Sequence, residues 1–176
     1  MLKTLRGIVG LPIRETGTKK VCGFVRDLII NPANGALIAV AAKAQAKIIL
    51  PIQDVQKLNK SAVWIEDCES LTAPTEIVRV AEVLKLKVPI FNNRVFTVSR
   101  QFLGQVIDFE FQTKGFILTK IEVAKKILGI PTNRKIISTK QIIQIKSSEI
   151  TVQDALVRAQ KRRLKGSNQL ELASGF

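Results

Sequence analysis

Residues 22–40 read CGFVRDLIINPANGALIAV, and residues 103–123 read LGQVIDFEFQTKGFILTKIEV. The two stretches carry similar residue types in the same order. Three landmarks recur at a constant separation of 81 positions: Gly23 with Gly104, Val25 with Val106, and Asp27 with Asp108. A pattern that occurs twice in one chain of 176 residues sets the first constraint on the fold.

The match extends beyond these stretches in both directions. The further matches are LPI at 11–13 with VPI at 88–90, Gly35 with Gly115 after a one-residue deletion, and KIILPIQDVQ at 47–56 with KIISTKQIIQ at 135–144. Because these landmarks keep the same order, the sequence indicates an internal duplication.

Each copy has the pattern of a β structure. Short runs of Val, Ile, Leu and Phe alternate with turn signals such as ETGTKK, NPANG and QTKG. The shared apolar positions step by three residues and then by two, whereas a regular strand steps by two only. We therefore expect a β-bulge or sharp bend at Asp27 and Asp108, with each carboxylate accepting backbone N–H groups. Gly23 and Gly104 are expected to supply a positive φ or a close backbone approach.

Two segments have helical rather than strand periodicity. Residues 73–86 place apolar side chains at helical spacing after Thr72 and Pro74, which predicts a short helix between the copies. Residues 152–165 follow Thr151 and predict a basic helix that begins in a capping box with Asp154. The expected organisation is a first domain at 1–72, a linker helix at 73–86, a second domain at 87–153, and a basic helix and tail at 154–176.

The G-x-V-x-D motif, the NPANG turn and KIILPIQDV leading into KSAVWIED together resemble the PRC-barrel family. The resemblance covers residues 5–68 and 84–153. It implies a mainly β chain of two tandem small barrels. The family includes the cytoplasmic barrel of the photosynthetic reaction-centre H subunit and the C-terminal barrel of the small-subunit ribosome maturation factor. Its members are binding and scaffold modules, so the resemblance implies a non-catalytic protein.

The second copy departs from the first at two places. It has Ser138, Thr139 and Lys140 where the first copy has Leu50, Pro51 and Ile52, so its barrel is expected to close differently there. It also has a lengthened loop at Leu128 to Asn133.

Composition argues against catalysis and points towards an anionic partner. The chain has 28 Lys plus Arg, 14 Asp plus Glu and no His, which gives a formal net charge of +14. It has no recurring carboxylate pair within one copy and no nucleotide-binding glycine pattern, so we expect no catalytic residue, cofactor or small-molecule substrate. Cys22 and Cys68 form no metal-binding motif and are expected to be free thiols in a cytoplasmic protein. No window has the roughly 20 apolar residues of a membrane span.

Aromatic residues are expected to serve the core before they serve recognition. Trp64 lies within an apolar strand pattern, and four Phe residues belong to the second copy: Phe102, Phe109, Phe111 and Phe116. An RNA-stacking role would require these rings to be exposed among basic residues.

Three classes of function remain. The leading one is a non-catalytic adaptor that contacts a protein partner, in a ribonucleoprotein or ribosome-assembly setting. The second is direct RNA binding, and the third is peripheral attachment to an anionic membrane. The candidate polyanion contact lies in the expected basic helix and consists of Arg158, Lys161, Arg162, Arg163 and Lys165. The alternative for these five residues is a solvated helix face.

The first testable prediction concerns this basic cluster. Neutralising about four to five phosphates should give a slope of log affinity against log salt of roughly −3 to −4 for single-stranded RNA. Changing all five residues to Gln should flatten this slope and leave the fold intact, since none is needed for a core. Filter binding across a salt series measures both. An equal slope in parent and variant would reject the cluster as a nucleic-acid contact.

Overall fold

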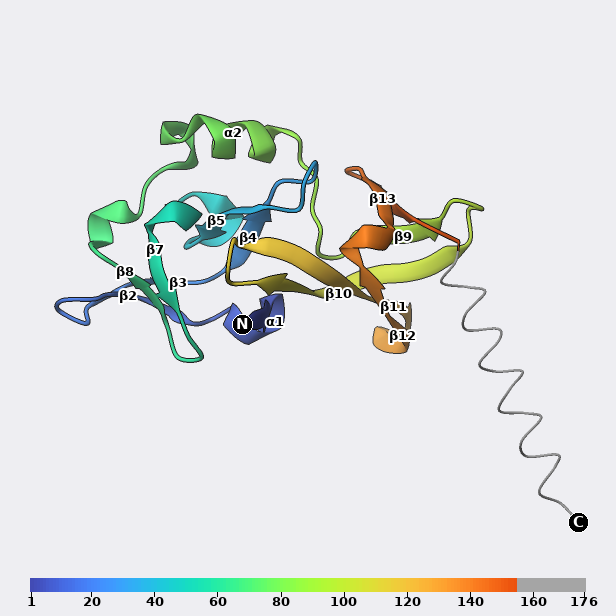
Figure 1. The fold of residues 1–176 in the computed structure, drawn as a ribbon, viewed down its shortest axis with the longest axis horizontal. Coiled ribbons are helices and arrows are strands. Elements are labelled where there is room, and N and C mark those ends of the chain that lie inside the picture. The colour runs from blue at the N-terminus through green and yellow to red at the C-terminus, as the bar shows by residue number, and fades with distance from the viewer. Residues whose placement is uncertain (155–176) are drawn as a thin grey trace, which may run out of the picture.

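A computed structural model of the chain describes residues 1–154. Strands dominate it, so the prediction of a mainly β chain is confirmed. Two α-helices are present among the described residues, and Figure 1 shows one of them, α2 (Val78–Lys85), lying over β4 and β5. The expected helix at 73–86 is therefore shorter, because Pro74–Glu76 forms a separate 3₁₀ turn, η4.

The first half of the chain, which we call the first repeat, contains seven strands between residues 12 and 65. Two elements precede it, β1 (Leu2–Thr4) and α1 (Leu5–Ile8). Its strands are β2 (Pro12–Glu15), β3 (Val21–Phe24), β4 (Asp27–Ile30), β5 (Leu37–Ala41), β6 (Ile49–Pro51), β7 (Val55–Leu58) and β8 (Val63–Ile65). Three 3₁₀ turns accompany them: η1 (Ala44–Ala46), η2 (Ile52–Asp54) and, after β8, η3 (Cys68–Ser70).

The second half, or second repeat, lies between residues 94 and 152 and has six strands. They are β9 (Arg94–Thr97), β10 (Phe102–Gln112), β11 (Ile117–Ile127), β12 (Ile130–Ser138), β13 (Ile142–Ile145) and β14 (Glu149–Val152), with the turn η5 (Thr139–Gln141) before β13.

The two repeats have the same strand pairing. The second repeat forms the order β12-β11-β10-β9-β14-β13, and β1 adds to β10. The first repeat forms β3-β2-β8-β7 and β4-β5-β6, which is the same order divided where β3 ends and β4 begins. The parallel pair β2–β8 has its counterpart in the parallel pair β9–β14. The internal duplication is therefore present in the hydrogen-bonded ladder as well as in the sequence.

The ladder also corrects the alignment of the two copies. Leu37 pairs with Ile30 and Leu118 with Phe111, so the separation stays at 81 through β5 and no residue is deleted in the turn. Gly35 thus matches Phe116, and not Gly115. Gly35 and Phe116 both have a positive φ, of 71° and 49° respectively.

Two further sequence matches shift for the same reason. Leu50 pairs with Val40 and Ile137 with Ile121, so the later strands match at a separation of 87, one less than KIIL against KIIS gives. Leu50 and Ile137 are both fully buried, which removes the apparent loss of a core residue at Ser138.

The counterpart of LPI is also not VPI. Ile13 in β2 matches Val95 in β9, because each pairs with the motif glycine of its own repeat.

Within the described residues, neither repeat closes into a barrel. Three open sheets are present, which corrects the expectation of two closed barrels. Closure would require β6 to pair with β7, and β12 with β13. The turns η2 and η5 lie at these two junctions, and β7 and β13 pair with β8 and β14 instead. The edge at this corner is therefore left unpaired in both repeats.

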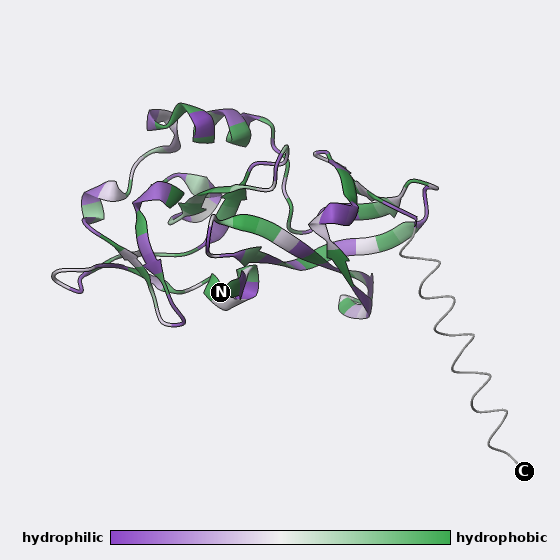
Figure 2. Ribbon diagram, in the orientation of Figure 1, coloured by the Kyte–Doolittle hydropathy of each residue, from purple (hydrophilic) through white to green (hydrophobic). Residues whose placement is uncertain are grey.

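The core is shared between the repeats. One cluster of buried side chains includes Leu28 and Leu37 from the first repeat and Phe109 and Leu118 from the second. A smaller cluster lies under α2, where Val80 packs with Ile29, Ile38, Ala39 and Ile49. Figure 2 shows apolar and polar residues alternating along α2, as expected for a helix with one buried face.

A two-fold contact joins the repeats. The Leu37 N–H donates to the Phe116 carbonyl at 2.8 Å, and the Leu118 N–H donates to the Gly35 carbonyl at 2.9 Å. The two bonds are equivalent, because Leu118 is the counterpart of Leu37 and Phe116 is the counterpart of Gly35. They flank the bridge Ala36–Ile117, which itself joins equivalent positions. This reciprocity is the signature of an isologous interface.

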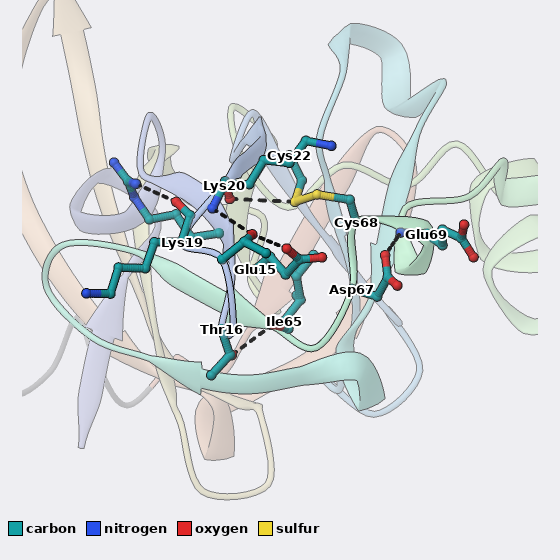
Figure 3. Close-up of a disulfide and its surroundings, with 11 residues drawn as sticks. Glu15, Thr16, Lys19, Lys20, Cys22, Ile65, Asp67, Cys68 and Glu69 are labelled. Atoms are coloured by element: carbon teal, nitrogen blue, oxygen red, sulfur yellow. Dashed lines mark hydrogen bonds between the residues drawn. A yellow bond between two sulfur atoms is a disulfide. The ribbon is translucent and has the colours of Figure 1, made fainter.

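Cys22 and Cys68 form a disulfide, with Cα atoms 5.3 Å apart (Figure 3), so the expectation of free thiols is wrong. The cysteines are far apart in sequence, but β3 and β8 both pair with β2, and Cys68 follows β8 by three residues. Leu103 takes the position of Cys22 in the second repeat. A disulfide is typical of oxidising compartments, so the cytoplasmic location stays a prediction that this bond does not support.

The two motif glycines, Gly23 and Gly104, differ in how strictly the backbone requires a glycine. Gly104 has φ 137°, and a Cβ there would overlap the Ala124 carbonyl and lie 2.8 Å from the Lys125 nitrogen. This happens because β10 continues past Gly104 directly against β11. The expectation of a positive φ or a close backbone approach is wrong for Gly23, where a Cβ would make only ordinary contacts, 3.7 Å from Ala42 and from Leu71.

The second prediction follows from this difference. Gly104→Ala should lower the free energy of unfolding by at least about 3 kcal/mol, since both the φ and the backbone overlap oppose a side chain. Gly23→Ala is the matched control and should change it by no more than about 1 kcal/mol. Urea denaturation measures both, and equal effects would contradict the structural difference.

Candidate functional site: a cavity beside Asp27

A cavity of about 630 Å³ lies where the first repeat meets the segment that links it to the second. This volume is within the usual range for ligand sites. Its walls come from β4, β5 and η1 of the first repeat, from the end of α2 and residues 87–91, and from Phe109 of the second repeat. Most of the lining side chains are apolar, among them Ile29, Val83, Leu84 and Ile90.

Asp27 is the one carboxylate in the lining. It sits at the break between β3 and β4, where the chain leaves one sheet for another. Its Oδ1 accepts the Leu28 N–H at 2.8 Å, and within residues 1–154 no cation pairs with it. The residue as a whole is exposed, but partial desolvation of its carboxyl by the atoms packed around it raises the pKa of Asp27 above its usual value of 3.8, and the hydrogen bond from Leu28 opposes this in part.

The counterpart of Asp27 in the second repeat is Asp108, and its surroundings are filled. Asp108 is 7% exposed, and its Oδ1 accepts the Phe109 N–H at 2.8 Å and the Arg6 N–H at 3.3 Å. The second bond comes from α1, which places Leu5 and Ile8 in the shared core. The short helix α1, whose Arg6 N–H bonds to the carboxylate and whose Leu5 and Ile8 are buried, therefore occupies the place beside Asp108.

Residues 86–90 hold the corresponding position beside Asp27, but they do not form such a helix. In α1 the Thr4 hydroxyl caps the helix by accepting the Gly7 N–H at 3.1 Å. The matching positions are Leu86, which has no side-chain acceptor, and Pro89, which has no N–H to donate. Lys87 instead has a positive φ of 50°. Because both groups of the cap are missing, the segment passes Asp27 without filling the space, and the cavity remains.

Three cations surround the opening. Arg26, Lys43 and Lys87 line the cavity, and all three are exposed. With Asp27 as the single acid, the lining carries a net positive charge, so an occupant with negative charge and apolar groups is favoured. The lining has no His or Cys and one carboxylate.

The structure places the sequence-predicted residues unevenly. Gly23, Asp27, Gly104 and Asp108 all lie on the strands beside the inter-repeat core, with the register of β10 shifting between Val106 and Asp108. The five basic residues from Arg158 to Lys165 lie outside the described residues.

The aromatic candidates also divide. Phe109 and Phe111 are buried, Phe102 is 39% exposed with its ring centroid 5.2 Å from that of Phe96, and Trp64 is partly buried in β8. The predicted packing role thus describes the first two best. The cations at the cavity opening were missed, since single Lys and Arg residues scattered over 26–87 have no motif that marks them.

Metal and membrane features are also limited in the part of the chain that the structure describes. No cluster of three or more His, Cys, Asp or Glu residues is placed to hold a metal ion there. Among the same residues, no helix is long and apolar enough to cross a membrane.

Comparison with models of known protein families finds no match for this chain, and comparison with curated proteins finds none either. The resemblance to PRC barrels therefore rests on the motifs in the sequence, and the site must be judged by its geometry.

The third prediction uses the raised pKa of Asp27. The folded state holds this proton to a higher pH than the unfolded chain does, so the carboxyl lowers stability as pH rises from about 3.8 through the folded pKa. Asp27→Asn keeps an oxygen for the Leu28 N–H but cannot ionise. The variant should be more stable than the parent at neutral pH, and the two should converge below this window. Urea denaturation at several pH values measures the gap, and a gap that does not vary with pH would contradict the raised pKa of Asp27.

Proposed function

We propose that this protein is a non-catalytic binding protein, and that the cavity beside Asp27 receives a short apolar and acidic segment of a partner protein. The observation that carries the proposal is the occupied counterpart of the cavity. Beside Asp108, the chain itself supplies a peptide segment that donates an N–H to the carboxylate and buries two apolar side chains.

The chemistry of the occupant follows from the comparison between the two places. Asp27 has the same bond from its own following residue that Asp108 has, but lacks the second N–H. A peptide backbone can supply that donor. The apolar walls then take Leu- or Ile-like side chains, as α1 does with Leu5 and Ile8, and the three exposed cations favour acidic residues at the ends of the segment.

We further propose that each repeat is an opened form of a PRC-barrel-like module. The motif G-x-V-x-D and the identical strand order of the two repeats support this interpretation. As the resemblance implies for that family, such modules bind and scaffold rather than catalyse. An adaptor role in a ribonucleoprotein setting and a cytoplasmic location stay predictions that follow from the same resemblance, and direct RNA binding is tested by the salt series above.

The fourth prediction tests the cavity by filling it. Val83→Trp places a large side chain in the lining from α2, and Val78→Trp is the matched control, because Val78 lies on the same helix, is 71% exposed and does not line the cavity. Selection from a displayed library of random twelve-residue peptides should enrich apolar and acidic sequences on the parent. These peptides should bind the Val78→Trp variant equally and the Val83→Trp variant at least about tenfold more weakly.

A charge control sharpens the same experiment. Lys87→Glu reverses a cation of the opening and should weaken the selected peptides, whereas Lys85→Glu changes a neighbouring residue outside the lining and should have little effect. Peptides that bind the Val83→Trp variant as well as the parent would place the binding surface elsewhere and reject the cavity.

A further inference from the structure

The hairpin formed by β11 and β12 extends beyond the sheet that contains it. The pairing of β11 with β10 ends at Ala124 opposite Gln105. Three more pairs of β11 with β12 follow, namely Lys125 with Thr132, Lys126 with Pro131, and Ile127 with Ile130. We call residues 125–132 the arm. At about 3.3 Å per residue, it projects roughly 10 Å past the sheet.

The arm is an addition to the duplicated fold. The separation between matching residues is 81 at Ala41 and Glu122 and 87 at Ile49 and Ile136. The second repeat therefore carries six additional residues at this point. The segment expected as a lengthened loop at Leu128 to Asn133 is instead mostly strand, with a two-residue turn at Leu128 and Gly129.

The residues of the turn do not favour its backbone conformation. Leu128 and Gly129 have φ of 50° and 81°, as a type I′ turn requires, and Asn or Asp is the usual residue before the Gly. Leu128 is instead 97% exposed, and the residues that flank the turn, Ile127 and Ile130, are 61% and 66% exposed. Among residues 1–154, this exposed Leu with positive φ adds neither turn stability nor core, and it presents an apolar surface to a partner.

Positive charge surrounds this apolar tip. Residues 123–136 contain four cations, Lys125, Lys126, Arg134 and Lys135, and no carboxylate. Of the four, Arg134 forms an ion pair with Glu122 at 3.2 Å, and the Lys126 Nζ donates to the Asn92 Oδ1 at 3.3 Å. Desolvation and the nearby charge of Lys125 lower the pKa of Lys135, so the cations stand close enough to repel one another. An anionic surface would relieve that repulsion.

We propose that the tip of the arm, Ile127 to Ile130, inserts into the interface of an anionic lipid bilayer, with the lysines at the level of the headgroups. Interfacial segments bury apolar side chains by about 5–10 Å, which matches the projection of the arm. Each cation near an anionic leaflet adds to the attraction, and salt screens it. A convex tip needs no preformed pocket in its partner, which favours a bilayer over a protein.

The fifth prediction is tested with the full chain and vesicles. The parent should co-float at low salt with vesicles of phosphatidylcholine containing about 30% phosphatidylserine, and not with phosphatidylcholine alone. The test variant combines Ile127→Thr, Leu128→Asn and Ile130→Thr. It should retain the hairpin, since Thr favours strands and Asn-Gly favours the turn. Its partition onto the anionic vesicles should fall at least about tenfold.

A matched control keeps the same chemistry away from the arm. It combines Val98→Thr, Val78→Asn and Ile143→Thr, three residues that are 54%, 71% and 56% exposed. This control should partition like the parent. Absence of vesicle binding by the parent, or equal partition of the arm variant and the parent, would overturn the proposal. In the first case a protein would become the preferred partner of the tip, and in the second another basic surface would account for membrane binding.

Discussion

The reciprocal pair of hydrogen bonds across Ala36 and Ile117 is the contact around which the two repeats are arranged. The bridge between them pairs Ala36 with Ile117 at a separation of 81, so each strand meets its own counterpart and neither repeat can shift without breaking both bonds. Buried side chains on both sides of the bridge, including Leu37 and Leu118, belong to one core cluster. The main apolar core is therefore shared by the two halves, and the pair behaves like a two-fold dimer within one chain.

The segment that precedes each repeat in the sequence packs on the other repeat, which follows the same two-fold arrangement. β1 and α1 come before the first repeat but bind the second, through the pairing of Lys3 with Phe111 and the bond from Arg6 to Asp108. Residues 78–91 come before the second repeat but pack on β4 and line its cavity. This exchange makes the interface between repeats larger than the strand bridge alone. It also places the two equivalent sites, beside Asp108 and beside Asp27, at matched positions.

Much of the fold could be predicted from the sequence because the duplicated landmarks fall on structural necessities. The step of three residues before Leu28 and Phe109 marks a break in one repeat and a register shift in the other, and Asp27 and Asp108 do accept local N–H groups there. The errors in alignment arose where similar residues recur in a row, as in KIIL and KIIS. Matching the identical residues there gives a separation of 88, whereas the strand pairing gives 87. Only the pairing of Leu50 with Val40 and of Ile137 with Ile121 decides between them.

The remaining features depend on contacts that no local pattern encodes. The disulfide needs β3 and β8 to share β2 as a neighbour, and the cavity depends on two missing capping groups, at Leu86 and Pro89, that matter only by comparison with Thr4 and Gly7. Barrel closure could not be judged either, because it depends on how η2 and η5 turn the chain. Since the paired strands match residue for residue, such local differences are where the repeats have diverged. The open cavity is specific to the first repeat and the arm to the second. Each repeat therefore presents a surface that the other repeat lacks, while the strand pairing is the same in both.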